Sequence, residues 1–219
     1  NGAAAKVPLA GFPYHALDQY LHKLLKAGHR VAICEQVEDP KLAKGIVKRE
    51  VMEVLSPGTA LSDKYLDQKE NNYLCAVTLD KRKCGISILD HSTGEFSTCS
   101  RVHEDLLSLL KQFHVSEVII PEDQENDFRI LTQREEIFIS TIPEWCRGFD
   151  TAYRSLTSFF NVSSLKGFGI EEDPLAVISA GCALYYIDKN FNGRIEHIQS
   201  LSLLRKEGKM CLDAFTIRN

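Results

Sequence analysis

Three acidic residues stand at the ends of short apolar runs: Asp80, Asp90 and Glu95. Clustered carboxylates can hold two divalent metal ions that hydrolyse a nucleic-acid backbone, so the pattern raises the hypothesis of a metal-dependent nuclease. The alternative is that the two aspartates form turns, as aspartate often does where a strand ends. We favour turns, because Asp80 is followed at once by Lys81-Arg82-Lys83, whereas a nuclease needs its first aspartate inside a packed acidic site.

Other catalytic patterns are missing from the chain. No G-x-x-x-x-G-K-[ST] phosphate loop occurs, and no Ser/His/Asp or Cys/His grouping has a recognisable local signature. The seven cysteines are odd in number, widely scattered and never in a C-x-x-C pair, which argues against a zinc site and against a disulfide framework. We therefore expect this chain to have no catalytic residue, no metal and no bound cofactor.

A second kind of chemistry, binding to a nucleic-acid backbone, is indicated near the start of the chain. The loop of residues 8–15 reads Pro-Leu-Ala-Gly-Phe-Pro-Tyr-His and precedes a predicted helix. Gly11 permits close backbone approach, the helix start offers amides to a phosphate, and Lys6, Tyr14 and His15 can add polar contacts. The alternative is that Phe12 and Tyr14 are core residues and His15 is a surface helix residue; the sequence physics alone favours it.

The elements that position this loop follow from periodicity. Leucines at three- and four-residue spacing predict a helix over residues 14–26, which Pro13 would begin and Gly28 would end. Apolar and alternating residues predict strands over 30–36 and 47–55. The segment between them includes a short predicted helix over 41–44, and Ser56-Pro57-Gly58 ends the second strand.

A longer α/β segment follows. Three runs over residues 73–80, 84–90 and 95–99 predict an antiparallel meander, and an amphipathic helix over 104–113 leads to a strand over 116–121. That order is the order of a ribonuclease H-like α/β layer. We further predict two helices, over 150–160 and 173–190, the second apolar around most of its circumference and therefore buried, and an extended segment over 195–204.

Composition is that of a globular protein, with 44% hydrophobic and 26% charged residues. No apolar run is long enough to span a bilayer and no signal peptide is recognisable, so we expect a cytoplasmic protein without a membrane contact. Formal net charge is −4, with eight Lys and Arg against six Asp and Glu in residues 1–58 and 18 against 24 in the rest. The basic excess of the first part is compatible with DNA contact and equally with an ordinary solvated surface.

Four sequence motifs, in a fixed order, resemble those of one protein family. They are Gly11-Phe-Pro-Tyr-His, Arg30-Val-Ala-Ile-Cys-Glu-Gln, Ser56-Pro-Gly-Thr and the later Asp90-His-Ser-Thr-Gly-Glu-Phe. They resemble the mismatch-binding and connector domains of the MutS mismatch-repair proteins. The resemblance implies DNA backbone contacts at Leu9, Gly11, Tyr14 and His15, and it matches Lys48 and Arg49 to a basic pair of the family. The family's Phe-x-Glu wedge is absent, and we expect the chain to begin beyond it.

The resemblance also implies an organisation. Residues 1–58 would be the C-terminal part of mismatch-binding domain I, 59–71 a linker, 72–190 a ribonuclease H-like connector domain II without catalysis, and 191–219 the start of core domain III. The longer parent would be a homodimeric, ATP- and magnesium-dependent ATPase that recognises mismatched double-stranded DNA and contacts MutL. For this piece the resemblance implies backbone positioning of DNA and interdomain coupling; the alternatives are a module that binds MutL alone and the nuclease above.

Overall fold

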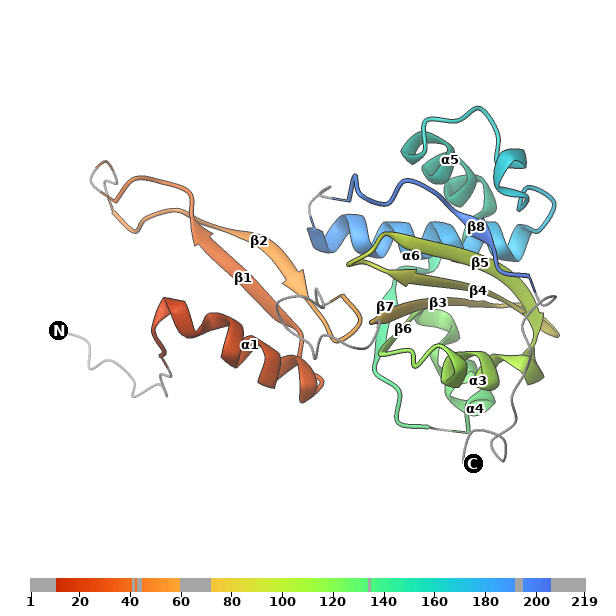
Figure 1. Ribbon diagram of the computed structural model, residues 1–219, viewed down its shortest axis with the longest axis horizontal. Helices are drawn as coiled ribbons and strands as arrows, with labels where there is room; N and C mark the ends of the chain where they lie inside the picture. Colours follow the sequence, from red (N-terminus) through yellow and green to blue (C-terminus); the bar gives the residue numbers. More distant parts are fainter. Residues whose placement is uncertain are drawn as a thin grey trace.

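The computed structural model describes residues 11–40, 42, 45–59, 72–133, 135–191 and 195–205, without the side chain of Tyr14. Figure 1 shows two parts, which we name the N-terminal unit (described residues up to 59) and the sheet unit (described residues from 72). The N-terminal unit contains the 3-10 turn η1 (Tyr14–Ala16), α1 (Leu17–Lys26), β1 (Val31–Gln36) and β2 (Arg49–Leu55). The sheet unit contains β3 (Tyr73–Leu79), β4 (Lys83–Asp90), β5 (Glu95–Val102), α3 (His103–Gln112), β6 (Glu117–Pro121), η2 (Glu122–Gln124), α4 (Glu125–Leu131), β7 (Ile139–Ile142), η3 (Glu144–Arg147), α5 (Phe149–Phe159), η4 (Lys166–Phe168), α6 (Pro174–Phe191) and β8 (Ser202–Leu203).

The N-terminal unit is one helix beside a two-stranded antiparallel ribbon. Helix α1 buries Leu21 and Leu25, which lie one turn apart, and leaves most of its remaining surface in water. Gly28 has a φ of 78°, a left-handed conformation that suits glycine and turns the chain out of the helix into β1. β1 and β2 pair in antiparallel register with a bulge on β2, where Met52 is the extra residue between the partners of Ile33 and Cys34. The predicted helix and both strands are confirmed, whereas the short helix over 41–44 falls largely outside the described residues.

The sheet unit is built on six strands in the order β7-β6-β3-β4-β5-β8. β3, β4 and β5 form the predicted antiparallel meander, with Tyr73 opposite Asp90 and Leu79 opposite Cys84. Helix α3 then carries the chain back across the sheet, so that β6 lies parallel to β3 and β7 parallel to β6. β8 adds a short parallel pairing to the other edge, along β5.

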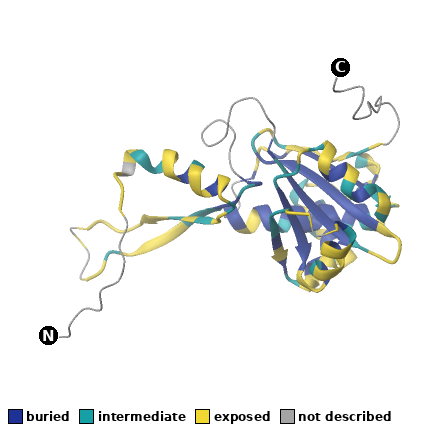
Figure 2. Cartoon of the chain, turned by 90° about the horizontal axis from the view of Figure 1, so that it is seen from below, coloured by how far each residue is buried: buried dark blue, intermediate teal, exposed yellow. Residues whose placement is uncertain are grey.

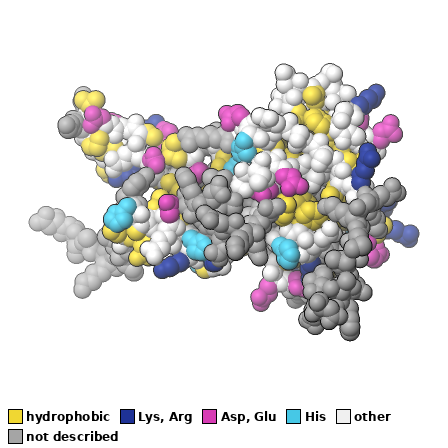
Figure 3. All heavy atoms as spheres, viewed as in Figure 1, with side chains coloured by type: hydrophobic (Ala, Val, Ile, Leu, Met, Phe, Trp, Pro, Cys, Tyr) yellow, Lys and Arg dark blue, Asp and Glu magenta, His cyan; other side chains and the backbone are white. Residues whose placement is uncertain are grey.

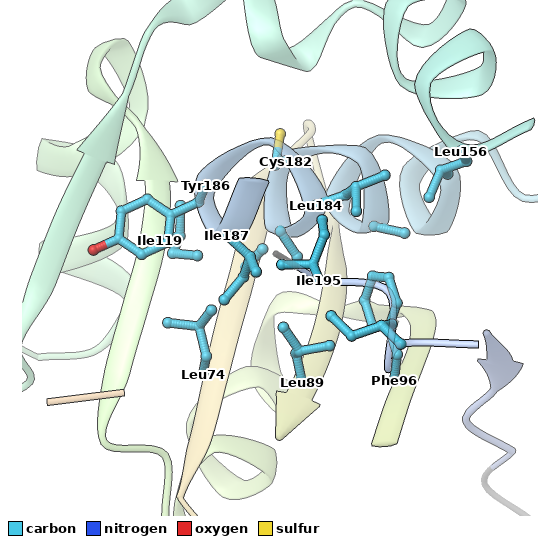
Figure 4. Packing of buried hydrophobic residues seen from close by; sticks show 14 of the residues in the cluster. Leu74, Leu89, Phe96, Ile119, Leu156, Cys182, Leu184, Tyr186, Ile187 and Ile195 are labelled. Carbon is cyan, nitrogen blue, oxygen red and sulfur yellow. The ribbon is translucent and has the colours of Figure 1, made fainter. Parts of the chain in front are cut away.

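Helices cover both faces of this sheet. Figure 1 shows α5 and α6 on one face and α3 and α4 on the other, and Figure 2 shows that the sheet between them is buried. Each face has its own apolar cluster, because successive side chains of a strand point to opposite faces. On the α6 side, Tyr186 and Ile187 pack over Leu74 and Leu89, as Figure 4 shows. The predicted mixed α/β class is confirmed.

Helix α6 sits unusually close to β4. A Cβ atom added to Gly85 would lie 2.0 Å from the carbonyl oxygen of Leu175, so only glycine fits there. Next to this contact the hydroxyl of Ser87 lies 2.7 Å from those of Thr98 and Ser179, which satisfies polar groups that are fully buried. As predicted from its all-round apolarity, α6 is a buried helix.

The segment after α6 is only partly extended. The predicted extended segment over 195–204 is wrong at its start, because Ile195 to Ile198 form a turn closed by a backbone hydrogen bond of 3.0 Å, and its one strand is β8. Three of its apolar side chains are nevertheless buried: Ile195, Ile198 and Leu201 are each at most 3% exposed. Residues 195–205 are therefore packed onto the sheet unit. β7 and α4 were not predicted.

The six described cysteines are all free thiols. Five are buried, and Cys34, on β1 opposite the bulge of β2, is exposed. The buried cysteines act as small hydrophobic side chains of the core. Over the same part of the chain, no helix combines the length and the apolar character that a bilayer crossing requires.

Candidate nucleic-acid interface

The predicted DNA-contacting residues that the structure describes are exposed. Gly11 and His15 precede α1, and Lys48 and Arg49 lie at the start of β2. Figures 1 and 2 both place the start of α1, the end of β1 and the start of β2 at the end of the N-terminal unit away from the sheet unit. Lys6 and Leu9, and the side chain of Tyr14, lie outside the described part of the chain. The structure thus brings two separated segments of the sequence to one end of one unit.

Phe12 is not a core residue. Its ring stacks on that of Tyr20 with a centroid distance of 4.6 Å, and the two side chains are 44% and 42% exposed. Lys23 places its ammonium 5.6 Å from the centre of the Tyr20 ring, a cation–π distance. Phe12 and Tyr20 therefore hold the loop before α1 against the helix surface without burying it.

Lys48 and Arg49 differ in whether their side chains already form an ion pair. The Lys48 ammonium contacts a carboxylate oxygen of Glu50 at 2.6 Å, and this hydrogen bond raises the pKa of Lys48. Arg49 has no ion-pair partner among the described residues. Figure 3 shows basic, acidic and hydrophobic side chains interspersed on the visible face of the N-terminal unit. Contact with a phosphate would have to compete with Glu50 at Lys48, but no such competitor exists at Arg49 in the described part of the chain.

The structure separates Asp80 from the other two acidic residues of the nuclease hypothesis, since Asp90 lies opposite Glu95 in the β4–β5 pair. Antiparallel pairing places Asp90 opposite Tyr73, at the end of the β3–β4 pair far from Asp80. Asp90 is buried and accepts hydrogen bonds from the backbone N–H and the hydroxyl of Ser92, at 2.8 and 2.6 Å. It is thus the turn residue of the alternative hypothesis. The described residues contain no group of three or more His, Cys, Asp or Glu side chains placed to hold a metal ion.

A buried carboxylate joins the two units. Glu117, at the start of β6, has no exposed surface. One of its oxygens accepts hydrogen bonds from the hydroxyl of Ser56 and, at 2.9 Å, from the backbone N–H of Gly58. Its other oxygen accepts from the hydroxyls of Ser140 and Tyr186, each at 2.6 Å. A single side chain therefore binds the loop after β2, strand β7 and helix α6.

The loop after β2 is shaped to fit this carboxylate. The backbone N–H of Ser56 donates to the hydroxyl of Thr59 at 2.9 Å, and the side-chain amide of Asn72 donates to the carbonyl of Pro57 at 2.7 Å. A Cβ atom added to Gly58 would lie 2.6 Å from the Cβ of Glu117, so this position admits only glycine. The Ser-Pro-Gly-Thr word, which the sequence identified as a strand stop, is also an interunit contact.

Tyr186 extends this contact. Burial and the neighbouring Glu117 carboxylate raise the pKa of its phenol to about 12. On its other side, the guanidinium carbon of Arg30, which precedes β1, lies 5.8 Å from the centre of the Tyr186 ring. Sequence reasoning missed Glu117 and Tyr186. The available signal was the single acidic residue in the otherwise apolar run of residues 117–121.

Comparison with known proteins assigns both units. Residues 1–64 match the family model of MutS domain I, and residues 72–199 match that of MutS domain II. The whole chain aligns with proteins named DNA mismatch repair protein MutS, at 42% identity in Flavobacterium johnsoniae, 41% in Parabacteroides distasonis and 42% in Porphyromonas gingivalis. It spans about a quarter of the length of these curated relatives, 24 to 25%. On these matches, the chain belongs to the MutS family and comprises residues of its domains I and II.

Proposed function

We propose that this chain is the DNA-positioning part of a longer mismatch-repair protein. In this role, the N-terminal unit contacts the backbone of a duplex, and the sheet unit links it to the remainder of the protein. The observation that carries the proposal is that two consecutive MutS domain models match the chain in order, within relatives named for DNA mismatch repair. The exposure of Gly11, His15 and Arg49 at one end of the N-terminal unit supports it.

The sheet unit is proposed to be a ribonuclease H-like connector that has no catalysis. In support, three antiparallel strands are followed by a helix and by two parallel strands on the other side of β3. The separation of Asp80 from Asp90 favours a linking role over the nuclease alternative. ATP, magnesium and the ATPase activity are proposed to belong to other parts of the longer, cytoplasmic and homodimeric protein.

Contact with MutL is a second proposed role, of the sheet unit. It would not require DNA, so immobilised MutL should retain the chain in a DNA-free pull-down. Failure of retention would leave DNA positioning as the only proposed role of the chain.

Binding of the chain to a labelled duplex, with and without one G·T mismatch, tests DNA positioning. Contacts to the backbone carry little sequence information, so we expect weak binding that is equal for both duplexes. Affinity should fall as salt rises, because each neutralised phosphate releases counterions. Absence of binding at low salt, or a several-fold preference for the mismatch at physiological salt, would contradict this assignment.

A further inference from the structure

The two units adhere through an apolar contact that has no directional preference. Leu21, Leu25 and Leu55 of the N-terminal unit belong to the same buried cluster as Leu74 and Ile187 of the sheet unit. Apolar burial favours contact but does not fix an angle, because its free energy depends on area and not on direction. The orientation of the N-terminal unit therefore needs a directional interaction as well.

Glu117 supplies most of that interaction, beside the single hydrogen bond of 2.7 Å that the side-chain amide of Asn72 donates to the carbonyl of Pro57. Its carboxylate accepts hydrogen bonds from Ser56 and Gly58 on one side and from Ser140 and Tyr186 on the other. The first pair belongs to the loop that ends the β1–β2 ribbon, and the second pair to β7 and α6 of the sheet unit. Hydrogen bonds in a buried site are strongly dependent on geometry, and each unmade bond there is costly.

We propose that Glu117 is a positioning residue that locks the N-terminal unit to the sheet unit at one angle, so that a force on bound DNA reaches β6 and α6. The transmission part rests on the DNA-positioning function proposed above, whereas the lock itself does not. Through this lock, a movement of the β1–β2 ribbon would displace the Ser-Pro-Gly-Thr loop and, with it, Glu117 on β6 in the six-stranded sheet.

The lock is tested without DNA by backbone ¹⁵N relaxation of the whole chain, which reports whether two parts tumble together. In the unchanged chain, amides of β1–β2 and of β3–β4 should share one rotational correlation time. In Ser56→Ala the ribbon amides should lose that common value and show a shorter correlation time. Ser140→Ala removes a hydrogen bond from the same carboxylate on the sheet side, so it is the matched control and should keep the common value.

Glu117→Gln is a second control. Gln can direct its oxygen to the obligate donor, the N–H of Gly58, and its amide to the hydroxyls of Ser140 and Tyr186, which can accept. It should keep the common correlation time, whereas Glu117→Ala should lose it. If Glu117→Ala fails to fold, Ser56→Ala still decides. One shared correlation time in Ser56→Ala, or equal loosening in Ser140→Ala, would overturn the lock.

The second part of the proposal, that a force on bound DNA reaches β6 through the lock, is tested with a duplex present. Addition of a duplex at low salt should shift the amide resonances of β6 in the unchanged chain and in Glu117→Gln, but not in Ser56→Ala. Persistence of these shifts in Ser56→Ala would overturn transmission through the lock. If no duplex binds, the DNA-positioning function fails and transmission fails with it, while the relaxation result for the lock stands by itself.

Discussion

The two units differ in how much of their apolar surface they bury by themselves. The sheet unit buries both faces of six strands under helices, whereas the N-terminal unit has one helix against a ribbon and few fully buried side chains, chiefly Leu21, Leu25 and Leu55. Even these three belong to a cluster that the sheet unit completes. The N-terminal unit therefore relies on the sheet unit for much of its core, and its distal surface is left free to contact a partner.

Two cavity-forming substitutions, one in each unit, should have the largest effects on stability and should distinguish the two units. Ile119→Ala, in a fully buried site of β6, should lower the free energy of unfolding of the chain by about 2–5 kcal/mol. Leu21→Ala should instead increase hydrogen exchange in α1, β1 and β2 and leave exchange in β3 and β4 unchanged. If Leu21→Ala increased exchange equally in both units, they would be a single cooperative body.

Acid should weaken the sheet unit first. Burial, and then the neighbouring His197, lower the pKa of His91 to about 4, below its ordinary value of 6.5. Because the unfolded chain binds the proton more readily, the stability that neutral His91 contributes is complete above pH 6.5 and is lost as the pH falls towards 4. We expect a loss of about 3 kcal/mol over that window, measured by urea unfolding. If the His91→Gln variant lost the same free energy of unfolding as the pH fell, protonation of His91 would not be the cause.

A smaller effect is expected at the start of α1. Phe12→Ala removes the ring that stacks on Tyr20 at 4.6 Å, so the loop before the helix should fray at a cost of about 1 kcal/mol. Exchange of the first amides of α1 measures it. Val162→Ala, a partly exposed apolar side chain of the sheet unit, is the matched control and should leave those amides unchanged.

The smallest expected effect on stability accompanies a change in DNA binding. Arg49→Ala should change the free energy of unfolding by less than about 0.5 kcal/mol, because the side chain is exposed. It should weaken duplex binding and reduce the slope of log affinity against log salt by about 1. Lys48→Ala should weaken binding less, since Glu50 already engages Lys48. Equal binding by Arg49→Ala and the unchanged chain would remove Arg49 from the interface.

The sequence was most informative where periodicity was strong. Alternation predicted the meander, and apolarity around the helix predicted the burial of α6. β7 was missed because Ile139–Ile142 is only four residues long and includes two polar side chains. The distance between Asp80 and Asp90 was in fact implied by the predicted meander, because the carboxyl ends of two successive antiparallel strands lie at opposite ends of the pair.

The contact of Glu117 with the N-terminal unit was harder to predict, for a physical reason. Glu117 and Ser56 are 61 residues apart, and neither has a local pattern that names the other. A buried glutamate in an apolar strand signals that partners exist, but only the fold shows which hydroxyls and which amide they are. At the proposed DNA interface, exposure of His15, Lys48 and Arg49 was expected, whereas the pairing of Lys48 with Glu50 was not.

The exposed position of Cys34 on β1 makes the two units unequally reactive towards thiol reagents. Burial raises the pKa of the Cys75, Cys84, Cys99 and Cys182 thiols in the sheet unit, which keeps them protonated and out of reach. Cys34, on the ribbon, is the exposed one among the described cysteines. Oxidants and alkylating probes should therefore modify the N-terminal unit before the sheet unit, and a label on Cys34 would report the motion of the ribbon without an engineered cysteine.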